Sequence, residues 1–265
     1  MIDIQNSIDE REVPLKKVGV RNVEYPVCVL DKKHKVQNTT ARVNLFVNLP
    51  HHFKGTHMSR FIEVFHKYKD DISINHFMEM LEEIRTKLTA EKSFGEISFP
   101  YFIEKEAPVS KSKGIIKYLC IYEAEVSESE KKFYLEVKVP VTTLCPCSKA
   151  ISQYGAHNQR GTVTVKVLYK DFFWLEDLID AVEKSASAPL YSVLKRQDEK
   201  FVTEQAYDNP RFVEDVVREV YIALKNFEGG GKFRWFSIEA ENEESIHAHN
   251  AYAYTDSDAP LVLQE

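Results

Sequence analysis

An alternation of apolar and polar residues with a period of two is the feature that most restricts how this chain can fold. Residues 37–50, QNTTARVNLFVNLP, place Ala41, Val43, Leu45 and Val47 on one face of an extended strand. Similar runs predict further strands at residues 18–31, 95–108, 117–144 and 161–171, and a pair of strands within 233–256. The polar stretch SESEKK is expected to form a hairpin within 117–144.

Apolar residues at helical spacing separate these strands. They predict helices over residues 73–88, 174–187 and 209–227, the first with Ser73 as its N-cap. Strands followed by helices and then strands, twice over, indicate an α+β protein built from two similar modules. We place these modules at residues 1–140 and 141–265 and expect the first 15 or so residues to be flexible.

The composition is that of an ordinary soluble globular protein, with 43% hydrophobic and 29% charged residues among 265. A net charge of −6 argues against broad nucleic-acid binding, although it permits a local basic pocket for an anion. The amino-terminal sequence has no secretory signal, and no apolar run reaches the roughly 18 residues that a membrane span needs. Four cysteines in such a chain favour free thiols and a cytoplasmic location.

The stretch TTLCPCSKAISQYGAHNQRG, residues 142–161, brings Cys145, Cys147 and His157 close together in the sequence. A C-x-C pair rarely closes a relaxed disulfide, because the intervening chain is too short. Pro146 ends the strand, so the thiols lie at an element terminus. The segment is therefore either a metal site or, in the simpler interpretation, a pair of small buried hydrophobic residues.

Two further segments carry groups of the same chemistry. His247 and His249 are two residues apart, which on a strand would direct both imidazoles to one face; a solvated polar loop is the alternative. Glu219 lies at the edge of the apolar stripe of its helix, where it either reaches solvent or points into a pocket. Glu204 is either a loop charge or a carboxylate ligand. Cations that could meet an anionic ligand, or simply lie at the surface, are Lys54, His57, Arg60, Lys149 and Arg160.

Together, TTLCPCSKAIS…GAHNQRG, KGTHMSRF, VTEQAYDNPRFVEDVVRE and ENEESIHAHNAYA resemble the type IB GTP cyclohydrolases, the first enzyme of folate biosynthesis in bacteria that use this form. The resemblance runs through almost the whole chain, with the motifs in the same order and spacing. It implies a tunnelling fold (T-fold): two tandem modules of antiparallel strands with paired helices. It also implies a homo-oligomer, of which a tetramer is one expected size, with active sites at subunit interfaces.

The same resemblance implies roles for individual residues. The implied ligands of one divalent metal per subunit are Cys147, His157, Glu204 and His249. Glu219 would anchor the guanine of GTP through its N–H groups, His247 would transfer protons beside the metal, and His57 would act from another subunit. The cations would hold the triphosphate. Zinc, manganese and iron(II) all remain open as the metal.

The implied reaction converts GTP and water into 7,8-dihydroneopterin triphosphate and formate. On this basis Cys147→Ala should abolish turnover, whereas Cys145→Ala should only weaken it, because Cys145 packs behind Cys147 or tunes its thiolate. One alternative is a nitrile reductase of the same fold, with Cys147 as its nucleophile. Another is a noncatalytic protein that binds metal and nucleotide. Three imidazoles and a carboxylate argue against both.

Overall fold

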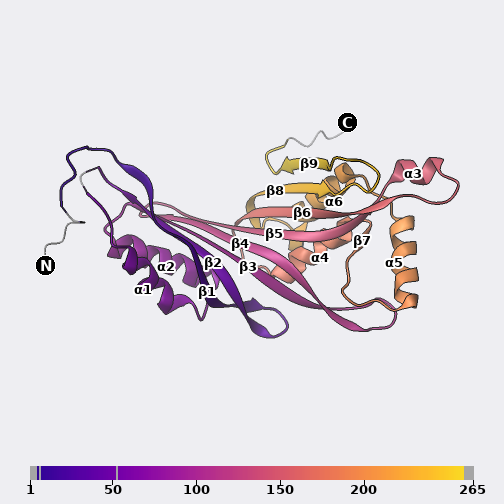
Figure 1. Ribbon diagram of the computed structural model, residues 1–265, viewed down its shortest axis with the longest axis horizontal. Coiled ribbons are helices and arrows are strands. Elements are labelled where there is room, and N and C mark those ends of the chain that lie inside the picture. Colours follow the sequence, from indigo (N-terminus) through magenta and orange to yellow (C-terminus); the bar gives the residue numbers. More distant parts are fainter. Residues whose placement is uncertain (1–4, 6, 52, 260–265) are drawn as a thin grey trace. The chain divides into compact units, whose positions relative to one another are not determined.

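The computed structural model describes residue 5, residues 7–51 and residues 53–259. Its strands are β1 (Leu15–Asp31), β2 (Lys35–Leu49), β3 (Lys92–Glu106), β4 (Lys113–Ser127), β5 (Lys131–Leu144), β6 (Asn158–Tyr169), β7 (Ala188–Pro189), β8 (Phe233–Asn242) and β9 (Ala251–Asp256). Its α-helices are α1 (Met58–Tyr68), α2 (Ile74–Lys87), α3 (Pro146–Ile151), α4 (Leu175–Ser185), α5 (Arg196–Asp208) and α6 (Val213–Lys225) (Figure 1). The predicted flexibility of the first 15 residues falls partly on residues 1–4 and 6, outside the described residues.

The strands pair in the order β1-β2-β3-β4-β5-β6-β8-β9, with β7 beside β5. The mixed α+β class with an antiparallel sheet is thus confirmed. The chain forms two compact units, one of residues 1–100 and 120–135 and the other of residues 101–119 and 136–265. Because β3, β4 and β5 each contribute residues to both units, no single cut such as 140/141 separates them.

In the first unit, α1 and α2 lie side by side, and α1 also packs on β1 (Figure 1). The apolar face of β2 pairs in register with its neighbours, with Val43 opposite Ile97 of β3. Gly95 of β3 permits close approach of α2, because a Cβ there would lie 2.8 Å from Phe77 Cζ. The small residue therefore lets a helix seal this face of the strands.

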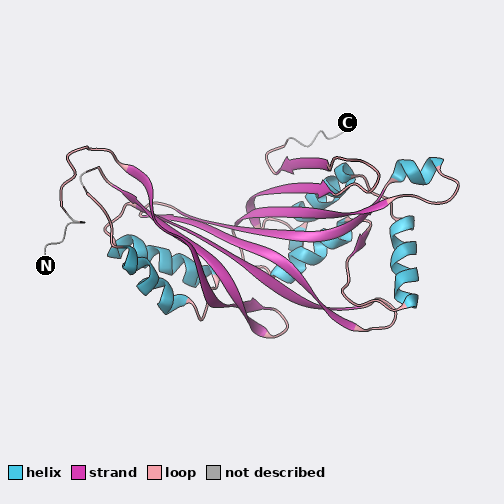
Figure 2. Cartoon of the chain, in the orientation of Figure 1, coloured by secondary structure: helices cyan, strands magenta, loops and turns pink. Residues whose placement is uncertain are grey.

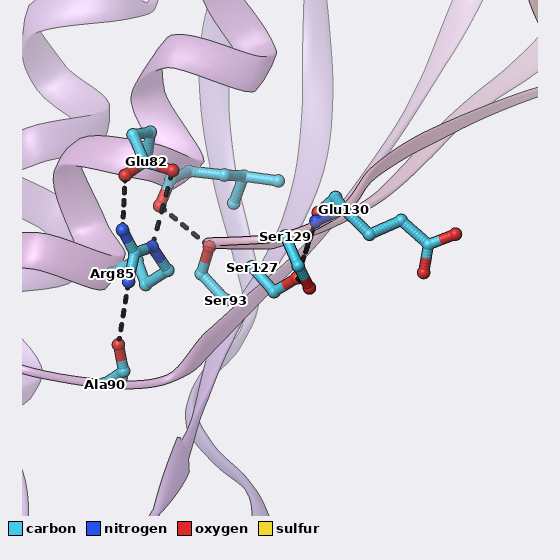
Figure 3. A network of polar contacts seen from close by, with 8 residues as sticks. Glu82, Arg85, Ala90, Ser93, Ser127, Ser129 and Glu130 are labelled. Carbon is cyan, nitrogen blue, oxygen red and sulfur yellow. Dashed lines mark hydrogen bonds and ion pairs between the residues drawn. The ribbon is translucent and has the colours of Figure 1, made fainter.

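Polar contacts hold the ends of these elements, as Figure 3 shows. The Arg85 guanidinium donates to Glu82 on its own helix at 2.6 Å and to the carbonyl of Ala90 at 3.4 Å. The buried Ser93 hydroxyl of β3 donates to the carbonyl of Leu81 at 2.8 Å. The contacts tie the end of α2 to the start of β3.

The second unit contains helices α4, α5 and α6. Helix α6 packs on α4, β8 and β9, and the buried side chains of Val216, Val217 and Val220 form its inner face. Strand β8 pairs with β6 on one side and β9 on the other. The short helix α3 follows directly after β5 (Figure 2). These elements carry most of the side chains singled out from the sequence.

A buried charged cluster ties α4 to the strands of this unit. Glu183 accepts hydrogen bonds from Lys105 Nζ and from the Tyr118 hydroxyl, both at 2.7 Å. Burial, together with the negative charge of Glu183, raises the pKa of Tyr118 well above its ordinary value. Tyr118 therefore stays a neutral donor, and the carboxylate of Glu183 is satisfied inside the unit.

Asp198 anchors the start of α5 and supplies a pH-dependent part of the stability. Its fully buried carboxylate accepts from the backbone N–H of Val109 at 2.9 Å, of Ser110 at 2.8 Å and of Lys195 at 2.8 Å. Burial raises the pKa of Asp198, but the hydrogen bonds from Ser110 and the backbone outweigh it and hold this pKa well below the usual range.

We expect Asp198→Asn to lower the melting temperature at pH 7 by several degrees. A depressed folded-state pKa stabilises the fold above the unfolded value of about 4, and this contribution is lost as the pH falls towards the folded-state pKa. The difference in melting temperature should therefore be largest above pH 5 and shrink below pH 4, as measured by circular dichroism. Asp208→Asn, at an exposed position of the same helix, is the control. A difference independent of pH would contradict the assignment.

No helix in the described part of the chain combines the length and apolar character needed to cross a membrane.

Candidate functional site

Three histidines and a cysteine line one cavity in the second unit. The cavity has a volume of about 260 Å³, and its walls include His157, His247, His249 and Cys145. Glu244 also lines it, so thiol, imidazole and carboxylate groups all face the same space. This volume is slightly below the range of about 300–1,000 Å³ that is usual for small-molecule pockets. It suits a ring-sized group better than a whole nucleotide.

The turn after β5 positions the cysteine. Cys145 is the N-cap of α3, and its Sγ accepts from the backbone N–H of Ser148 at 3.4 Å. Pro146, the first residue of the helix, fits there because that position needs no N–H donor. The backbone N–H of Cys145 donates to the carbonyl of His157 at 3.1 Å. Both groups are thereby held at the same wall of the cavity.

Gln159 fixes the ring of His157. Its side-chain N–H donates to Thr143 Oγ1 at 2.9 Å, so Gln159 Oε1 faces His157 Nδ1 at 3.0 Å and accepts from it. This network assigns the imidazole tautomer that carries its proton on Nδ1. The other nitrogen, Nε2, is left with a lone pair that could bind a metal.

Loss of this hydrogen bond should weaken metal binding without removing a ligand. We expect Gln159→Ala to lower the affinity for a divalent metal by about 10- to 100-fold, because the ring of His157 would no longer be oriented. Competition with a fluorescent chelator measures this affinity. Gln205→Ala, at an exposed position on α5, is the matched control. Unchanged affinity in Gln159→Ala would show that His157 is not a ligand.

The His-x-His segment does not lie on a strand, contrary to one expectation from its spacing. His247 and His249 lie in the connection between β8 and β9. Their rings nevertheless stack, with centroids 5.2 Å apart, and the His247 ring lies 6.4 Å from that of His157. His247 Nδ1 is 3.7 Å from Glu244 Oε2. Loop packing rather than strand alternation therefore gathers these imidazoles.

Two of the predicted metal ligands are not among the residues that line this cavity. Cys147 is exposed on α3, and Glu204 is an exposed residue of α5 whose carboxylate lies 3.8 Å from Lys200 Nζ. Within the described residues, no group of three or more cysteine, histidine or acidic side chains is arranged so that it could hold a metal ion. The structure thus brings His157 and His249 together and adds Cys145 to them. The complete predicted ligand set stays a prediction.

Glu219 pairs with Arg211, which was not among the residues predicted from the sequence. Arg211 precedes α6, lines the cavity, and donates from Nη1 to Glu219 Oε1 at 2.9 Å. Glu219 itself is not a lining residue, and 43% of its side chain is exposed. Arg211 therefore connects the predicted guanine anchor to the cavity wall. Only its position directly before the helix could have suggested this role.

The predicted cations are divided between the two units. Lys149 of α3 donates to the carbonyl of Tyr207 and lies over its ring at 4.3 Å, while Arg160 is exposed on β6. The other three cations lie in the first unit: Lys54, His57 at the N-cap of α1, and Arg60, which donates to the carbonyl of Lys87 at 3.3 Å. None of the five cations lines the cavity.

The sequence of the chain that forms this cavity matches a known protein family. Residues 1–253 match the family described as Type I GTP cyclohydrolase folE2. The chain belongs to the type I GTP cyclohydrolase FolE2 family. Among its relatives, GTP cyclohydrolase FolE2 of Syntrophus aciditrophicus is 56% identical over 97% of this chain and 100% of its own length. GTP cyclohydrolase FolE2 of Geotalea uraniireducens is 54% identical over 97% of this chain and 94% of its own length.

Solved structures resemble this FolE2-family chain in fold. Uricase from Arthrobacter globiformis superposes with a TM-score of 0.52 at 7% identity, covering 91% of this chain and 92% of the uricase. Urate oxidase from Bacillus sp. TB-90 gives a TM-score of 0.51 at 10% identity, covering 91% of this chain and 98% of its own. At such low identity the likeness shows the fold alone, and it confirms the predicted T-fold.

Proposed function

We propose that this chain converts GTP and water into 7,8-dihydroneopterin triphosphate and formate, the first step of tetrahydrofolate biosynthesis. The observation that carries the proposal is the group of three imidazoles on one cavity in a chain of the FolE2 family. The reaction hydrates C8 of the purine, opens the ring and releases that carbon as formate; the ribose then rearranges and closes onto the exposed amine to form the pterin ring. Each step moves protons, which imidazoles do well near neutral pH.

His247 is the group that we assign to proton transfer. Its ring centroid lies 6.4 Å from that of His157 and 5.2 Å from that of His249, and Glu244 Oε2 lies 3.7 Å from its Nδ1. We propose that the side chains of His247 and Glu244 together relay the proton during turnover. Glu219 would accept the N–H groups of the guanine, with Arg211 holding its carboxylate.

The residues present also suit a divalent metal. His157, with Nε2 left open, and His249 are the imidazoles that we propose as ligands, together with the thiol of Cys145 from the same wall. Glu204 stays a predicted ligand. A bound cation would supply a water molecule activated near neutral pH. Thiolate and imidazole donors suit zinc or iron(II), and a carboxylate would also admit manganese.

The two cysteines can be tested against each other. We expect Cys145→Ser to lose bound metal and to lower turnover by about 100-fold or more, because its thiol lines the cavity, whereas Cys147→Ser should retain most of both. Metal per subunit and formate release measure the two effects. The reverse result would support the assignment of Cys147 made from the sequence.

The reaction class is tested by incubating metal-depleted protein with GTP, with and without added Mn²⁺, Zn²⁺ or Fe²⁺. We expect formate, and the fluorescence of the oxidised pterin, only when metal is present. GTP binding without formate under all conditions would favour a noncatalytic binding protein. Reduction of a nitrile substrate without metal would favour the nitrile reductase.

We further propose a cytoplasmic homo-oligomer with active sites shared between subunits. Free thiols at all four cysteines fit a reducing compartment. At the end of α3 and just after it, Ile151 is 84% exposed and Tyr154 is 97% exposed, which suits burial by another subunit. If sites are shared, mixing inactive His57→Ala subunits with inactive His157→Ala subunits should restore part of the turnover, because some mixed sites would contain both histidines.

A further inference from the structure

Arg211 links the cavity to the carboxylate of Glu219. Its backbone N–H donates to the carbonyl of Leu144, next to Cys145, at 3.0 Å. Its Nη1 donates to Glu219 Oε1 at 2.9 Å. The arginine is therefore fixed at its backbone by the strand that leads to the cavity and at its tip by the helix that carries Glu219.

The guanidinium has donor capacity that the described residues do not use. Its Nε–H is buried and meets no acceptor in the described part of the chain. Only 28% of the Arg211 side chain is exposed, compared with 72% for Arg218 on α6. A buried donor without an acceptor destabilises the free protein, and an acceptor on a ligand would remove that cost. Arg211 thus differs from a solvated surface arginine.

The pair matches the edge of one purine in particular. Guanine presents an acceptor, O6, next to two donors, N1–H and N2–H. Adenine presents a donor at position 6 and an acceptor at N1, and hypoxanthine lacks the second donor. A carboxylate can accept from N1–H and N2–H but cannot donate to O6, so recognition of the whole edge needs a donor beside it, and a guanidinium supplies one.

We propose that Arg211 determines the specificity of the site by donating a hydrogen bond to O6 of guanine while it holds Glu219 against N1–H and N2–H. This assignment rests on the proposed function, because it takes GTP as the ligand. It adds a second recognition residue to the predicted anchor. It also gives a reason why the two side chains pair in the free protein.

The test changes one atom of the nucleotide and one side chain of the protein, and measures whether the effect of one change depends on the other. GTP, 6-thio-GTP and ITP are compared as substrates of the parent, Arg211→Ala, Arg211→Lys and Glu219→Gln, with the protein loaded with metal. Sulfur at position 6 is a weak acceptor, so the parent should prefer GTP over 6-thio-GTP in kcat/KM by about tenfold or more. In Arg211→Ala this ratio should fall to about one, and Arg211→Lys should keep part of it.

The ratio of kcat/KM for GTP to kcat/KM for ITP measures the contribution of Glu219 instead. This preference should survive in Arg211→Ala and vanish in Glu219→Gln, because ITP lacks only the N2–H donors. Arg218→Ala, whose arginine pairs with Asp215 at 3.3 Å, is the matched control and should leave both ratios unchanged. Because each ratio is internal to one protein, partial unfolding of a variant would not alter it.

An unchanged ratio of GTP to 6-thio-GTP in Arg211→Ala would overturn the proposal. So would a loss confined to the triphosphate, seen as weaker binding of GTP but not of guanosine, since Arg211 would then be a phosphate contact. If the parent binds GTP without releasing formate, the proposed function fails. Calorimetric affinities then replace kcat/KM in the same comparison, and the role of Arg211 is still decided.

Discussion

Turnover of GTP is expected to fall by at least about 1,000-fold in His157→Ala, together with the metal content of the purified protein. His157 lines the cavity, faces His247 and carries an Nε2 that the hydrogen bond to Gln159 leaves open. A catalytic metal contributes several kcal/mol to lowering the barrier, and each 1.4 kcal/mol or so is tenfold in rate. Metal analysis and formate release measure the two losses.

A histidine at the surface provides the control for this substitution. His76 pairs with Asp71 at 2.7 Å in the first unit and is well exposed, so His76→Ala should retain both metal and turnover. Loss of turnover in His157→Ala with the metal fully retained would show that His157 acts on the substrate and not as a ligand. The graded effect expected of Gln159→Ala should lie between the two histidine variants.

The second large effect is expected at Glu219. In Glu219→Gln, kcat/KM for GTP should fall by at least about 100-fold, mainly through KM. An amide offers one acceptor and one donor, so an N–H group would oppose an N–H group of guanine. The substitution also removes the negative partner of Arg211. Steady-state kinetics separate KM from kcat and so distinguish lost anchoring from lost chemistry.

Glu199→Gln serves as the matched control, because Glu199 is exposed on α5. It should leave KM for GTP unchanged. If Glu219→Gln changed kcat alone, Glu219 would be acting in the chemical steps, and the guanine would be bound elsewhere.

The strands were the most predictable part of this fold. Period-two alternation located β2 and β6, and the polar residues after Ser127 correctly indicated the turn before Lys131. The helix predicted over residues 73–88 is α2, with Ser73 at its N-cap. A strand that buries one face in the sheet must alternate apolar and polar residues along its sequence. This explains why the strands could be predicted from the sequence.

Three helices were missed, and their composition explains why. Helix α3 is only six residues long and begins with a proline. Helix α5 buries only Asp198 and Ala206, so it has almost no apolar stripe. Helix α1 does bury Phe61 and Phe65, but its first residues were interpreted as a basic segment for an anion. The periodicity of the local sequence is a weak predictor of a helix that is held in place by tertiary contacts.

The site was predictable in its chemistry but not in its geometry. His157, His247 and His249 were all chosen from the sequence, and the structure gathers them at one cavity. The choice of Cys147 over Cys145 rested on the family resemblance. The chain turns into α3 at Pro146, and Cys145 lines the cavity while Cys147 is exposed. A pairing such as that of Arg211 with Glu219 depends on contacts that spacing does not encode.

The sharing of β3, β4 and β5 by both compact units limits how such a protein can be rearranged. Neither unit corresponds to one contiguous stretch of gene, so neither can be excised, fused elsewhere or exchanged with a relative as a cassette. A chimera joined at residue 140 would splice two parents within β5. Recombination that preserves whole strands must occur at turns such as the one between Ser127 and Lys131. The two units are thus expected to be inherited together.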